Sequence, residues 1–150
     1  MFEPLTIHLG ANTDGPHLVI EVIDYQHPEI AEPEGLDLMR CRATAHAHPV
    51  SASFDIPIGL WELEELRDYL SEINSGNGPS TNVSLGSGLL ALSFAPTKRG
   101  PVLCAVLLKT VDASHVRLEF LVTLEPAAIT RTLMQLARLT VRTSKINGGE

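Results

Sequence analysis

The sequence predicts an α+β fold, a mainly antiparallel sheet of about seven or eight strands with two amphipathic helices. Three observations predict it. Many segments alternate apolar and polar residues with the period of a half-buried strand. Only two segments, about residues 60–75 and 126–142, repeat apolar residues at helical spacing. Clusters of glycine, proline and asparagine separate the segments, and each predicted helix follows a run of strands.

The chain opens with two predicted strands and a polar loop. Residues 5–9 and 18–25 are apolar and β-branched enough for strands, and the turn-rich residues 10–16 separate them. Residues 26–35 are polar and contain two prolines. We expect this loop to be the least structured part of the chain.

Residues 38–47 and 50–58 both alternate strictly and predict a hairpin that turns at His48-Pro49. Matching their apolar faces requires Ala47 opposite Val50, and the same register sets Arg42 opposite Asp55. Proline cannot take the positive φ of a primed two-residue turn. We therefore expect a looser four-residue connection with the same parity.

The first predicted helix, about residues 60–75, has two sharply different faces. Its inward face is apolar: Leu63, Leu66, Leu70 and Ile73. Its outward face is acidic: Glu64, Glu65, Asp68 and Glu72. Like charges four residues apart cost about 0.2–0.5 kcal/mol per pair, so something other than local helix stability must tolerate them. Residues 76–79, Gly-Asn-Gly-Pro, predict a glycine cap followed by a proline stop.

The second half repeats the plan. Residues 83–85 and 89–94 are predicted strands around a Gly86-Ser87-Gly88 hairpin turn, and residues 102–108 are apolar on both faces, as in a central strand. Residues 116–124 alternate as a half-buried strand. Pro126 opens the second helix, whose apolar positions are Ile129, Leu133 and Leu136 and whose outer face is basic: Arg131, Arg138 and Arg142.

We predict one domain over residues 1–143 and a disordered tail over residues 144–150. Residues 54–70 and 120–136 can be superimposed with a single offset, since each runs from an alternating strand into an amphipathic helix. Two β-meander-plus-helix halves are therefore expected. An ancient duplication and convergent α+β patterning both remain open.

Charge and composition narrow the function classes. Residues 1–72 hold 14 acidic and 3 basic residues, a net charge of −11, whereas residues 73–150 hold 4 acidic and 8 basic residues, a net charge of +4. The overall charge of −7 argues against nucleic acid as a partner, and no apolar run approaches the ~20 residues of a membrane span. The first residues lack the basic and apolar regions of a signal peptide, so we expect a cytoplasmic protein with Cys41 and Cys104 as buried thiols.

Candidate catalytic groups are few. His46 and His48 form an H-x-H pair, but a metal site needs three or four ligands and no further residue completes the set. We interpret them as two half-exposed imidazoles and keep a metal or small-ligand site as an alternative. The chain contains no G-x-S-x-G, phosphate-loop or dinucleotide motif. We therefore expect neither an enzyme nor a cofactor.

The remaining candidate is a surface. Trp61 lies near the acidic stripe of the first helix, and an aromatic residue beside carboxylates is typical of a protein-binding site. The alternative is that Trp61 packs against Tyr25 or residues 26–35. The basic stripe of the second helix is a natural complement. Either the two helices neutralise each other within one molecule or the stripes meet between two copies in a homodimer.

Four segments carry a resemblance to known proteins: residues 20–28, Trp61-Glu62-Leu63-Glu64-Glu65-Leu66, Tyr69-Leu70 and Leu89-Leu90-Ala91-Leu92-Ser93-Phe94. In this pattern the chain resembles a diffuse group of small bacterial proteins of unknown function that includes the WapI-type immunity proteins of polymorphic toxin systems. Where that group often has tryptophan, this chain has Leu38-Met39. The resemblance implies a protein that binds and inhibits a toxin, and the acidic first half would suit a basic toxin. The alternatives are a self-associating structural domain and a ligand-binding protein that uses His46 and His48.

Overall fold

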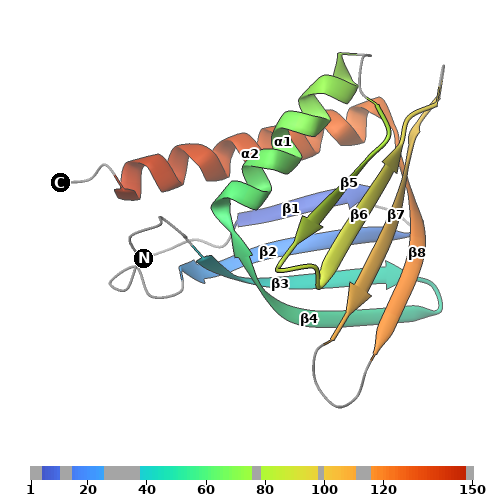
Figure 1. The fold of residues 1–150 in the computed structure, drawn as a ribbon, viewed down its shortest axis with the longest axis horizontal. Helices are drawn as coiled ribbons and strands as arrows, with labels where there is room; N and C mark the ends of the chain where they lie inside the picture. Colours follow the sequence, from blue (N-terminus) through green and yellow to red (C-terminus); the bar gives the residue numbers. More distant parts are fainter. Residues whose placement is uncertain are drawn as a thin grey trace.

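The computed structural model describes residues 5–10, 15–25, 38–75, 79–97, 100–110 and 116–147. In these residues each half of the chain is a four-strand antiparallel meander followed by a helix (Figure 1). The first half is β1 (Leu5–Gly10), β2 (His17–Tyr25), β3 (Leu38–Ala47), β4 (Val50–Gly59) and α1 (Leu60–Asn74). The second is β5 (Thr81–Leu85), β6 (Leu90–Ala95), β7 (Val102–Lys109), β8 (Arg117–Leu124) and α2 (Pro126–Asn147). The predicted α+β fold with a mainly antiparallel arrangement of strands is confirmed.

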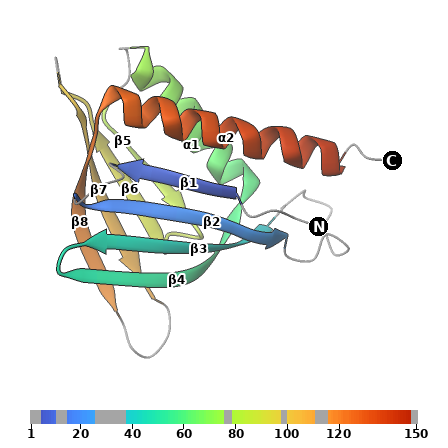
Figure 2. The same cartoon turned by 180° about the vertical axis from the view of Figure 1, so that it is seen from behind.

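The eight strands described form two separate sheets rather than one, each with its strands in sequence order. The strands of the first sheet run across those of the second, and both helices lie together at one side (Figures 1 and 2). Each strand directs alternate apolar residues inward, so the two inner faces and the apolar stripes of the helices merge into one buried cluster. Its largest fully buried side chains include Phe94, Ile7, Met39, Leu63, Leu66 and Leu70.

The β3–β4 hairpin has the predicted register. Ala47 lies opposite Val50 and Arg42 opposite Asp55, and Arg42 Nε is 3.2 Å from Asp55 Oδ1. Both side chains are exposed, so the pair contributes at most about 1 kcal/mol. The predicted four-residue connection is wrong. The strands are joined by His48 and Pro49 alone, whose peptide bond is cis, and a cis-proline closes a tight turn without positive φ.

Helix α2 runs alongside the free edge of β1 (Figure 2). The backbone N–H of His8 donates to Gln135 Oε1 at 2.7 Å, and the buried Thr132 hydroxyl donates to the carbonyl oxygen of His8. Arg131 Nη2 donates to the carbonyl oxygen of Gly10 at 2.6 Å. Polar side chains of α2 thus satisfy the edge groups that a further strand would pair with.

Two predicted boundaries differ from the structure or lie outside it. Helix α2 continues to Asn147, so residues 144–147 belong to the helix and not to the irregular tail that we expected. The sequence from Pro126 to Asn147 contains no glycine and no internal proline, and therefore nothing that would end the helix at residue 142. Helix α1 ends with Ser75 as its C-cap, whereas the predicted glycine cap and the 26–35 loop lie outside the described residues.

Among the described residues, no helix combines the length and the apolar character needed to cross a bilayer.

Candidate functional site

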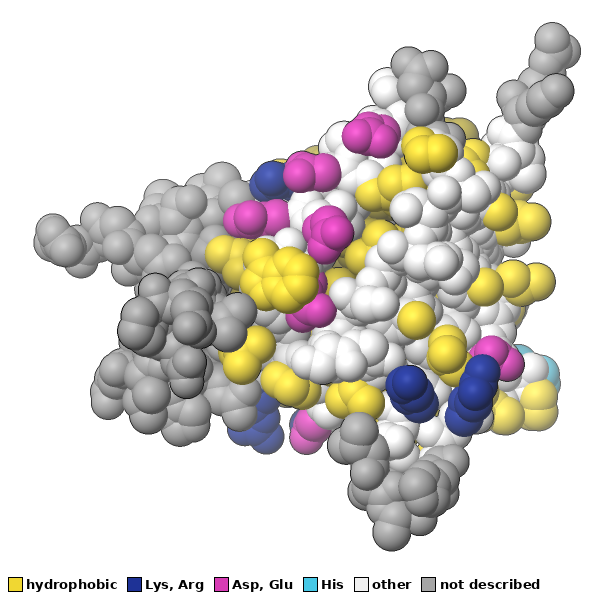
Figure 3. Space-filling view, in the orientation of Figure 1, with side chains coloured by type: hydrophobic (Ala, Val, Ile, Leu, Met, Phe, Trp, Pro, Cys, Tyr) yellow, Lys and Arg dark blue, Asp and Glu magenta, His cyan; other side chains and the backbone are white. Residues whose placement is uncertain are grey.

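The outward face of α1 gathers the predicted surface residues. Trp61 is 53 % exposed, Glu65, Asp68 and Glu72 are exposed, and Glu64 is half-buried. Figure 3 shows carboxylates gathered along this helix beside protruding apolar side chains. The opposite face buries the four predicted apolar residues, Leu63, Leu66, Leu70 and Ile73. Burial of these apolar side chains therefore offsets the repulsion between the like charges on the outward face, which would destabilise the isolated helix.

Trp61 is held in place at the start of α1. Gly59 is the N-cap residue, with extended backbone angles of φ −78° and ψ 144°. A Cβ atom at Gly59 would lie 2.6 Å from Trp61 Nε1, so the indole ring lies directly against the bare backbone of this glycine. One side of the ring is thereby supported, and about half of the residue surface is exposed. A positioned aromatic ring loses little conformational entropy when a partner covers it.

Glu62 is the important residue that the sequence did not single out. It is only 5 % exposed, although its neighbours Trp61 and Glu65 face solvent. Its Oε1 accepts hydrogen bonds from the backbone N–H of Gly59 at 2.8 Å and of Gly86 at 3.2 Å. Glu62 thus ties the start of α1 to the turn between β5 and β6. The capping-box spacing, a cap residue followed three positions later by Glu, is the signal that could have identified the first contact.

The two arginines of the predicted basic complement whose side chains are described, Arg131 and Arg138, form no ion pair with the acidic face. Arg131 is half-buried and bonded to β1, Arg138 is exposed, and the side chain of Arg142 lies outside the described residues. Helices α1 and α2 pack together. Between described residues, however, the structure gives no ion pair from an α1 carboxylate to Arg131 or Arg138. The pair it gives on α1 is Arg67 Nη2 with Asp68 Oδ1 at 3.4 Å.

The two candidate histidines lie at the end of the β3–β4 hairpin, His46 on β3 and His48 in the turn. His46 lies opposite His17 with ring centroids 4.6 Å apart, and its Nδ1 is 3.2 Å from Ser51 Oγ. His48 is exposed in the β3–β4 turn. Within the described part of the chain, no group of three or more His, Cys, Asp or Glu side chains is placed to hold a metal ion. Among these residues, the structure thus supplies no third ligand for a metal at His46 and His48.

The two cysteines do not form a reactive pair. Cys41 and Cys104 are both free and buried. Burial raises the pKa of each thiol to about 12, and the nearby Glu62 carboxylate adds to the effect at Cys41. Because the thiolate is the nucleophile, neither cysteine is activated for covalent chemistry near neutral pH.

His8 links the docking of α2 to pH. Burial lowers the pKa of the His8 imidazole, and the positive charge of Arg131 and the neighbouring His17 add to this. Gln135 uses Oε1 for the His8 backbone N–H, so its Nε2 faces His8 Nδ1 at 3.0 Å and the neutral ring accepts there. Protonation would set two donors against each other beside Arg131.

We expect the protein to lose stability as the pH falls below about 6.5, the pKa of histidine in the unfolded chain, towards the lower pKa of His8 in the folded protein. In this range the unfolded chain binds more protons than the folded protein does. His8→Gln should flatten this part of the dependence, as measured by urea unfolding between pH 8 and pH 5.5. His48→Gln changes an exposed turn histidine and should leave the wild-type slope. Equal slopes for wild type and His8→Gln would contradict the expectation.

Comparison with known proteins adds no relative. The chain matches no protein-family model, no curated protein and no solved structure.

Proposed function

We propose that this protein is a non-catalytic protein-binding module that recognises a basic surface of a partner protein through Trp61 and the carboxylates of α1. The observation that supports this most directly is the half-exposed Trp61, which lies against Gly59 and shares a helix face with exposed carboxylates. Among the described residues, these carboxylates form no ion pair with α2. Aromatic anchors provide much of the affinity of an interface, and charges around them steer the encounter.

The resemblance to immunity proteins suggests the class of partner. An immunity protein binds and inhibits a toxin, and a toxin with a basic active-site surface would match the outer face of α1. Binding would cover Trp61 and bring the partner's lysines or arginines against Glu65, Asp68 and Glu72. Because these carboxylates lie at the solvent edge, they should mainly accelerate association at low salt, while Trp61 should determine how slowly the complex dissociates.

We expect Trp61→Ala to weaken the complex with the toxin encoded beside the gene by about 30-fold or more, the effect of losing a central aromatic anchor worth about 2 kcal/mol. Surface plasmon resonance at low and high salt would measure it. The Glu65→Lys, Asp68→Lys double variant should instead slow association and reduce its salt dependence.

Met134 on α2 provides a matched control, because it is 56 % exposed and Met134→Ala also truncates an exposed apolar helix residue. This variant should bind as the wild type does. If no complex forms at low salt, the toxin assignment is wrong. If a complex forms and Trp61→Ala binds equally well, the binding surface lies elsewhere.

A further inference from the structure

The outer face of β3 and β4 differs in character from the outer face of β6, β7 and β8. The outer face of β3 and β4 is polar: Arg42 pairs with Asp55, and Thr44 Oγ1 lies 3.1 Å from Ser53 Oγ. The outer face of β6, β7 and β8 instead presents short and branched apolar side chains: Ala91, Ala95, Leu103, Ala105, Leu107 and Leu121. Apolar residues also occur on the outer face of the first sheet, at Val19 and Leu38, but they are fewer there than on β6, β7 and β8.

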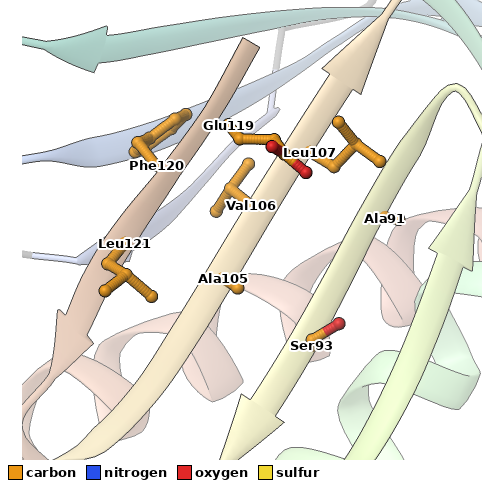
Figure 4. Close-up of a pocket in the computed structure, with 8 residues that line it drawn as sticks. All are labelled: Ala91, Ser93, Ala105, Val106, Leu107, Glu119, Phe120 and Leu121. Atoms are coloured by element: carbon orange, nitrogen blue, oxygen red, sulfur yellow. The ribbon is translucent and has the colours of Figure 1, made fainter. Parts of the chain in front are cut away.

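This apolar face has both a projection and a hollow. Leu121 on β8 is 61 % exposed, and Leu103 on β7 is 39 % exposed. Beside Leu121 lies a hollow of about 380 Å³ whose floor includes Ala91, Ser93 and Ala105. Figure 4 shows Leu107 and Leu121 standing beside these short side chains.

We propose that this face binds a second copy of the chain across a two-fold axis, with Leu121 of each copy in the hollow of the other. A two-fold interface uses the same patch on both partners, so the patch must complement itself. A projecting leucine next to a hollow of small residues meets that requirement. The buried contact is then leucine against alanine and leucine, which favours association through loss of apolar surface.

The charges on this face oppose a second copy less than the charges on the outer face of α1 do. Beside the apolar residues lie Lys109, Arg117 and Glu119, and Arg117 Nη2 is 3.1 Å from Glu119 Oε1. Both signs occur side by side and leave these three residues with a net charge of only +1, so two copies repel each other little. The outer face of α1 carries Glu65, Asp68 and Glu72 and would repel its own copy. Self-association is therefore expected on the second sheet and not on α1.

The area of the face indicates a weak dimer. A strand residue covers about 16 Å² of sheet, from a rise of about 3.3 Å and a strand spacing of about 4.8 Å, so β6, β7 and β8 with 6, 8 and 8 residues present roughly 350 Å². Two faces, with the relief of their side chains, would bury about 1,000 Å², which lies at the lower limit for a biological interface. The dimer should therefore dissociate on dilution.

Sedimentation velocity of the full chain over a wide range of concentration tests the proposal. We expect a monomer–dimer equilibrium that persists at high salt, because the contact is apolar. Leu121→Asp should leave only monomer. Ala105→Lys, at a second exposed position in the hollow, should do the same and guards against misfolding of one variant, with circular dichroism as the check of folding.

Val50→Asp is the matched control, because Val50 is 48 % exposed and lies on β4 in the other sheet. This variant and Trp61→Ala should dimerise as the wild type does. A wild type that stays monomeric at every concentration overturns the proposal. A dimer that survives both Leu121→Asp and Ala105→Lys also overturns it. A dimer that is lost at high salt and in Arg138→Glu overturns it as well, because that result would place the contact between the helices.

Discussion

Glu62→Ala is expected to destabilise the protein by about 3–4 kcal/mol, a large part of the 5–15 kcal/mol typical of a domain. The substitution leaves the backbone N–H groups of Gly59 and Gly86 without their acceptor in a buried position. Each such loss costs about 1–3 kcal/mol. Urea unfolding followed by circular dichroism would measure the change.

Glu65→Ala is the matched control for this prediction, since it removes an exposed carboxylate from the same helix and should change stability by less than about 0.5 kcal/mol. Glu62→Gln keeps an acceptor oxygen, so the stability it loses should lie between the stability losses of the two alanine variants. If Glu62→Ala and Glu65→Ala have equal stability, Glu62 does not connect α1 to the β5–β6 turn in solution.

Much of the fold follows from residue periodicity. Strict alternation over residues 38–47 and 50–58 determined the register, because a slip of one residue would expose the apolar face, and the Arg42–Asp55 pair lies where this register places it. Helical spacing likewise identified the buried face of α1. These predictions succeed because burial acts on each element separately, whatever the rest of the chain does.

Contacts between distant segments could not be predicted in the same way. The pattern of residues 102–108 indicates a central strand, and β7 does lie between β6 and β8, but nothing in the pattern shows that one of its apolar faces stays exposed. The arginines of α2 suggested a complement to the α1 carboxylates, yet Arg131 binds the carbonyl oxygen of Gly10, more than a hundred residues away. The sequence does not show which backbone carbonyl groups lie at the edge of a sheet.

The candidate site shows the same division. Its acidic residues and Trp61 were identified from the helical pattern alone. The burial of Glu62 instead depends on how the two sheets meet, because that arrangement brings the β5–β6 turn to the start of α1. The start of α1, where Trp61 lies, is thus held in part by a turn that is distant in sequence.

That turn gives the second large effect: Gly86→Ala is expected to destabilise the protein by about 2–4 kcal/mol, measured by urea unfolding. Gly86 has a φ of +61°, which costs a residue with a side chain about 1–2 kcal/mol, and its Cβ would lie 2.2 Å from Cγ2 of the buried Ile56. Gly88 separates the two causes, because its φ is +88° but a Cβ there meets nothing within 4 Å, so Gly88→Ala should cost only about 1 kcal/mol. In an Ile56→Ala background, which removes the closest clashing atom and leaves the Pro57 carbonyl oxygen at 3.1 Å, Gly86→Ala should cost clearly less than in the wild type and little more than Gly88→Ala does. If Gly86→Ala costs the same with and without Ile56, the turn does not pack against β4, and the acceptor role of Glu62 would then have to be explained by the cap alone.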